Sequence, residues 1–85
     1  MRVEFVKAAL KAYEKASEPD RSRLRSAILS LKENPHPPQS LRLTNTPFFR
    51  LRVGDWRVIY HLLSERDTVL VLKVARRSEQ TYKDF

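Results

Sequence analysis

Cysteine is absent from this 85-residue chain, which excludes disulfide bonds and thiolate metal sites. A chain without disulfides is typical of an intracellular protein, so we expect a cytoplasmic location. No apolar run comes near the roughly 18 residues that a membrane helix needs, and no secretory signal pattern opens the sequence. We therefore expect no membrane partner.

Glycine is almost as scarce, since Gly54 is the only one in the chain. It precedes an aspartate between two runs of β-branched, aromatic and apolar residues, and this pattern predicts a β-hairpin with a two-residue loop. Glycine in the first loop position suits a type II′ turn, where the backbone needs a positive φ. The resulting register places Arg52 directly opposite Arg57.

Alternation along the two hairpin strands separates an apolar face from a basic face. The apolar face comprises Phe49, Leu51, Val53, Trp56, Val58 and Tyr60. The basic face carries Arg50, Arg52 and Arg57. Two arginines directly opposite each other repel, so folding alone gives no reason to place them there. A local choice that opposes stability points to function, and phosphate is the ligand that guanidinium groups bind best.

Acidic residues are in the minority, with 10 Asp and Glu against 17 Lys and Arg and a net charge of +7. A basic balance predicts an anionic partner, such as nucleic acid, a membrane surface or an acidic protein segment. Hydrophobic residues make up 41% of the chain, which is too many for a disordered tail. A chain of this length makes one small domain, which we assign to residues 1–85.

The first half of the chain predicts a strand and two helices. Residues 1–5 form the strand, and helical spacing then places Leu10 in the buried stripe of the first helix. The second helix begins after Ser17, which suits an N-cap, and runs to about residue 33. Its early arginines are Arg21, Arg23 and Arg25, which we interpret as an ordinary solvated face.

The second half predicts a linker, the hairpin and one more strand. Prolines within residues 34–38 end the second helix and force an extended linker, in which Leu41 packs against the core. After the hairpin, residues 68–75 are apolar on both faces, as in a strand with neighbours on both sides. The order is β-α-α-β-β-β plus a C-terminal tail. We expect an α+β fold, a small and mainly antiparallel sheet with both N-terminal helices packed on one face.

The chain resembles the RelE/ParE superfamily of bacterial and archaeal toxin–antitoxin toxins over essentially its full length. The resemblance rests on Leu-Lys-Glu-Asn-Pro at residues 31–35, on the hairpin sequence at residues 49–60 and on the closing pair Arg76-Arg77. It implies a RelE-like fold and a cognate antitoxin as partner. RelE-like members are ribonucleases that cleave mRNA in the ribosomal A site.

Carried over by position, the resemblance implies a site on the basic face and the tail. Catalysis is expected from Arg52, Arg57, Arg77 and Tyr82, and RNA contacts from Phe48, Arg50, Arg52, Lys73 and Arg76. Phe48 lies on the basic side by alternation and suits base stacking. Lys73 has no assigned face, because the length of the preceding turn is uncertain by one residue.

RNA cleavage by its own 2′-hydroxyl needs a base, stabilisation of charge on phosphorus, and an acid for the leaving oxygen. Guanidinium groups can stabilise the charge on phosphorus, but arginine cannot serve as the base. Tyr82 suits the base if nearby arginines lower its pKa. The sequence has no cluster of carboxylates at metal-ligand spacing, so we expect metal-independent chemistry and no cofactor. We expect His36 and His61 to be surface side chains rather than catalytic groups.

The function expected from these features is that of a toxin that cleaves mRNA on the ribosome and inhibits translation. Operator DNA is expected as a partner only through the antitoxin complex. A ParE-like inhibitor of DNA gyrase is one alternative. The other is a catalytically inactive homologue that acts as a module of the antitoxin or DNA complex.

Overall fold

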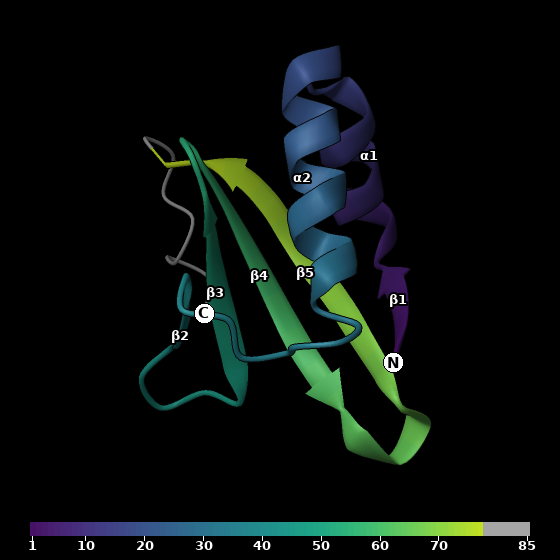
Figure 1. Cartoon of the computed structure of the whole chain (residues 1–85), viewed down its shortest axis with the longest axis vertical. Helices are drawn as coiled ribbons and strands as arrows, with labels where there is room; N and C mark the ends of the chain where they lie inside the picture. The colour runs from purple at the N-terminus through teal and green to yellow at the C-terminus, as the bar shows by residue number, and fades with distance from the viewer. Residues whose placement is uncertain (78–85) are drawn as a thin grey trace.

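The computed structural model describes residues 1–77. Its elements are β1 (Arg2–Phe5), α1 (Lys7–Lys15), α2 (Glu18–Ser30), β2 (Ser40–Arg42), β3 (Phe48–Val53), β4 (Trp56–Leu63), a 3₁₀ turn (Ser64–Arg66) and β5 (Thr68–Arg76). The strands form one five-stranded sheet in the order β1-β5-β4-β3-β2. All neighbours are antiparallel except β1 and β5, which run parallel. Both helices lie on one face of this sheet, as predicted for an α+β fold (Figure 1).

The strand β2 was not predicted. The sequence favours a linker there, but residues 40–42 pair with β3 at the edge of the sheet and place Leu41 opposite Arg50. Three residues are too short to show alternation, and the prolines just before them point to irregular structure. The pairing also turns Leu41 away from the helices and leaves it 58% exposed. The prediction that Leu41 packs on the core is therefore wrong.

The hydrophobic core lies between the two helices and the sheet. Its fully buried members include Leu24, Ile28, Leu31, Val58, Tyr60, Val69 and Val71. From α1 the core takes Ala9, which is 1% exposed, rather than Leu10, which is 39% exposed. The prediction that Leu10 lies in the buried stripe is thus wrong, because α1 packs close to β5 through the small side chain of Ala9. None of the helices within residues 1–77 is long and apolar enough to cross a membrane.

Tyr60 anchors the linker that joins the helices to the sheet. Its side chain is fully buried, and its hydroxyl donates a hydrogen bond to the Pro35 carbonyl oxygen at 2.7 Å. Its ring stacks on Phe49 with the ring centroids 5.6 Å apart. Burial raises the pKa of the Tyr60 phenol, against a smaller lowering by a hydrogen bond with Ser40. The proline segment is thereby held against the sheet.

Candidate functional site

The hairpin between β3 and β4 forms as predicted. Gly54 has a φ of +58°, whereas Asp55 does not have a positive φ, which fits the signs expected for a type II′ turn. Arg52 lies directly opposite Arg57. The backbone N–H of Arg77 donates a hydrogen bond to the Asp55 carbonyl oxygen at 2.6 Å. The end of β5 is therefore tied to the turn, and residues 52 to 57 and residue 77 meet at one corner of the sheet.

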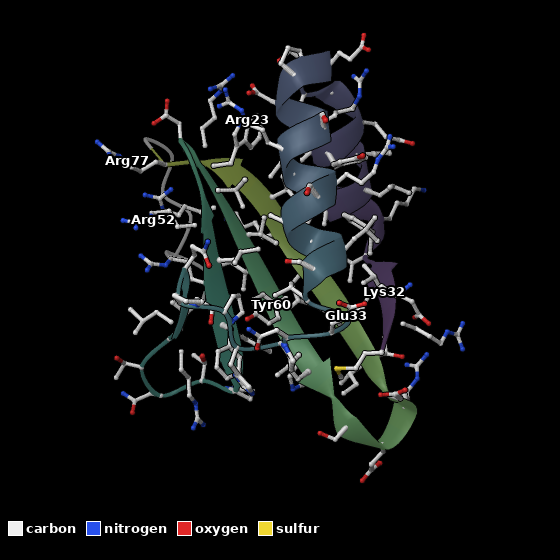
Figure 2. The ribbon with its side chains drawn as sticks, in the orientation of Figure 1. Arg23, Lys32, Glu33, Arg52, Tyr60 and Arg77 are labelled. Atoms are coloured by element: carbon white, nitrogen blue, oxygen red, sulfur yellow. The ribbon has the colours of Figure 1, made fainter. Side chains whose placement is uncertain are left out.

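Arginines that have no acidic partner among the described residues occupy this corner on the face away from the helices. Arg52 and Arg77 are exposed, and Figure 2 shows their side chains directed away from α1 and α2. Neither side chain, nor that of Arg50, makes an ion pair or hydrogen bond within residues 1–77. The Nε atom of Arg50 is buried and has no acceptor there. A buried donor without an acceptor is costly in a folded protein.

Arg57 lies on the predicted face but not in the predicted environment. Only 7% of it is exposed, and its Nη1 atom donates hydrogen bonds to the carbonyl oxygens of Gly54 and Trp56, each at 2.8 Å. The prediction of an exposed guanidinium facing Arg52 is therefore wrong. The folded hairpin thus presents two carbonyl oxygens to the Nη1 atom of Arg57. Whether Arg57 also acts at a phosphate stays a prediction.

Arg76 lies on the opposite face from Arg52. It pairs across the sheet with Trp56, whose ring it covers with the guanidinium carbon 4.8 Å from the centroid. It also forms an ion pair of 3.5 Å with Asp20 on α2. Trp56 belongs to the helix-facing side, so Arg76 lies on that side too and is not grouped with the other arginines. The structure therefore does not bring Arg76 to the predicted RNA surface. Its charge instead ties the sheet to α2.

The structure places Lys73 and Phe48 with the arginines. Lys73 pairs with Ile59, which is also the partner of Arg50, so both side chains share the face away from the helices. The register between β4 and β5 shifts by one residue directly after this pair, and such a shift cannot be read from the sequence. Phe48 packs edge-on against His61 with the ring centroids 5.2 Å apart. Its place on the basic side is as predicted.

The remaining residues discussed from the sequence have different outcomes. Tyr82 lies outside the described residues, so its catalytic role stays a prediction. His61 lies on the basic face, as alternation predicts, whereas His36 packs edge-on against Phe49 at the linker. Within residues 1–77 no three side chains of the His, Cys, Asp and Glu types gather as a metal site would require.

Arg23 is the residue near the site that the sequence did not single out. A Cβ atom built on Gly54 would lie 3.9 Å from its Nη1 atom, so this guanidinium lies against the hairpin turn. The two residues are 31 positions apart. No local pattern brings them together, because their proximity depends on how α2 packs on the sheet.

Comparison with known proteins gives a family match along almost the whole chain. The sequence profile of the ParE toxin of type II toxin–antitoxin systems matches residues 3–81. Among curated proteins, none matches the sequence.

Solved structures share the fold. A RelE–RelB complex from Pyrococcus horikoshii superposes with a TM-score of 0.80 at 26% identity, covering 92% of this chain and 96% of that one. The RelBE toxin–antitoxin complex of Escherichia coli superposes with a TM-score of 0.78 at 23% identity, covering 92% of this chain and 98% of that one. A YoeB/ParE toxin from Agrobacterium tumefaciens superposes with a TM-score of 0.79 at 13% identity, covering 89% of this chain and 98% of that one.

Proposed function

Because the chain belongs to the ParE toxin family of type II toxin–antitoxin systems, in the RelE/ParE superfamily, we propose that it cleaves mRNA on the ribosome and so stops translation. Its partner in the resting cell is a cognate antitoxin, and the complex of the two contacts operator DNA. The structures from P. horikoshii and E. coli, which are complexes of this kind, support the antitoxin partner.

The unpaired arginines of the basic face carry the proposal of an RNA substrate. Arg52 and Arg77 meet at one corner, and Arg50 lies two residues along β3 on the same face; none of the three forms an ion pair with a carboxylate within residues 1–77. Holding like charges together without acidic partners costs stability unless a polyanion binds there. Lys73 and Phe48 on the same face add a cation and a stacking surface, as single-stranded RNA binding uses.

The reaction that these groups suit is attack of the RNA 2′-hydroxyl on the adjacent phosphorus. The 2′ oxygen loses its proton and bonds to phosphorus, the bond to the 5′ oxygen breaks, and that oxygen takes a proton. The products are a 2′,3′-cyclic phosphate and a 5′-hydroxyl end. Arg52, Arg50 and Arg77 stabilise the charge that develops on the phosphoryl oxygens. Tyr82 is proposed as the base, and Arg57 holds the turn that carries Arg52.

The first experiment induces the chain in cells with and without its antitoxin. We expect methionine incorporation to stop before thymidine incorporation, and the antitoxin to restore it. The family profile that matches is named for ParE, and this observation supports gyrase inhibition as the second candidate. Loss of thymidine incorporation while methionine incorporation continues would replace the nuclease proposal with the second candidate.

The second experiment maps cleavage of ribosome-bound mRNA by primer extension. We expect Arg77→Ala to lower cleavage about a hundredfold or more, the usual cost of losing one preorganised charge contact in a transition state. Arg2→Ala is the matched control, because it removes another exposed arginine, one that lies on β1 beside Thr68 at the opposite end of β5. Wild-type cleavage by folded Arg77→Ala would remove Arg77 from the site.

The end groups of the products test the chemistry. Cleavage should continue in excess EDTA on ribosomes fixed beforehand, and 2′,3′-cyclic phosphate ends should appear. Products with 5′-phosphate ends would point instead to a water activated by a bound metal.

A further inference from the structure

Arg23 brings a charge from α2 to the side of the hairpin turn that faces the helices. Its Nη1 atom would be 3.9 Å from a Cβ atom on Gly54, so the guanidinium lies against the tip of the hairpin. Figure 2 shows Arg23 on the α2 side of the sheet and Arg52 and Arg77 on the other side. Arginines from three separate parts of the chain thus surround one turn of two residues.

The neighbouring arginines of α2 have structural partners, and Arg23 has none within the described residues. Arg21 donates a hydrogen bond to the Ala16 carbonyl oxygen at 2.6 Å, and Arg25 donates one to the Tyr13 hydroxyl at 3.3 Å. On the same side of the sheet, Arg76 is paired with a carboxylate on α2. Arg23 is exposed and makes no ion pair or hydrogen bond with any part of residues 1–77. No contact in the described part of the chain therefore accounts for a guanidinium at this place.

The charge balance at the tip favours an anion. Asp55 is the exposed carboxylate of the turn itself, and one negative charge there is set against those of Arg23, Arg52 and Arg77, which have no ion pair within residues 1–77. The other carboxylate nearby, that of Asp20, already has its partner in β5. An excess of positive charge on both sides of an exposed turn suits a chain of phosphates that passes over it.

We propose that Arg23 is a phosphate-contacting residue that extends the RNA surface round the hairpin tip to the side of the helices. An RNA strand that Arg52 and Arg77 hold on the basic face then continues over Gly54 to Arg23. Gly54 itself has no side chain to block this path. The inference rests on the proposed function for its choice of RNA, but it concerns binding and does not require cleavage.

Fluorescence anisotropy with a labelled 20-nucleotide single-stranded RNA, titrated at several salt concentrations, tests the contact. Each phosphate contact contributes about 0.7 to the slope of log K against log salt concentration for a single strand. Arg23→Gln should lower the slope by about that amount. The matched control is Arg25→Gln, which removes the same charge from the same helix where the side chain points to Tyr13. It should change the slope far less, and Arg23→Lys should restore most of it.

The outcomes separate this inference from the proposed function. Equal slopes for Arg23→Gln and Arg25→Gln would overturn it, because Arg23 would then act only through net charge. A lower slope for Arg52→Gln together with a wild-type slope for Arg23→Gln would also overturn it while leaving RNA as the ligand. A lower slope for Arg23→Gln in a protein that does not cleave mRNA would uphold the contact and refute the nuclease. Wild-type protein that binds gyrase and not this RNA would overturn both.

Discussion

Replacing Arg57 with alanine tests whether this residue holds the hairpin or only binds ligand. The change removes the two hydrogen bonds from Nη1 to the carbonyl oxygens of Gly54 and Trp56, each at 2.8 Å. A hydrogen bond from a charged group contributes about 1.5–3 kcal/mol. One nitrogen makes both bonds, and water can replace it at exposed Gly54, so we expect a total loss of about 2–3 kcal/mol. For a domain of this size the melting temperature should fall by on the order of 10 °C or more.

The matched control for this change is Arg52→Ala, at the position directly opposite in the hairpin. Arg52 is exposed and has no partner within residues 1–77, so its removal should leave the melting temperature unchanged or slightly higher. The assay is thermal unfolding followed by circular dichroism, with urea unfolding to give the free energy. Arg57→Ala and Arg52→Ala proteins that melt within 2 °C of each other would refute the reasoning, because Arg57 would then contribute no more than a surface arginine.

Three further outcomes follow from the same structure. Gly54→Ala should cost about 1–2 kcal/mol, because alanine disfavours a φ of +58°, and a wild-type melting temperature would mean that the turn can rearrange. Burial raises the pKa of Tyr60, so its stabilising effect is complete below a pH of about 10 and is lost as the pH rises further. Tyr60→Phe should weaken that alkaline loss in urea titrations, at a cost of about 0.5–1.5 kcal/mol for the hydrogen bond to Pro35. Arg52→Thr should add about 0.2–0.5 kcal/mol, near the lower end for cross-strand pairs, and should lower mRNA cleavage. A less stable variant at both low and high salt would show that Arg52 has a favourable contact in the fold.

The sequence by itself determined the hairpin and its two faces. A single glycine, placed first in a two-residue loop, sets the register, because few other residues accept a positive φ there. Strict alternation then decides which side chains share a face, so the sides of Arg52, Arg57 and Phe48 followed from the sequence. These are local properties of the backbone. They act over a few residues and do not depend on the rest of the fold.

The tertiary structure decided what those side chains contact. The edge strand β2 forms because β3 offers a free edge, and the register shift beside Lys73 depends on the pairing of β4 with β5. Arg57 became a buried donor because the folded turn presents two carbonyls to it. Arg76 lost its predicted place because its pairing with Trp56 puts it on the helix-facing side, where Asp20 of α2 is its partner. Arg23 reached the hairpin by the same packing of α2 on the sheet. Contacts between distant segments are set by the way whole elements pack, and neither spacing nor composition encodes that arrangement in a form that can be read along the chain.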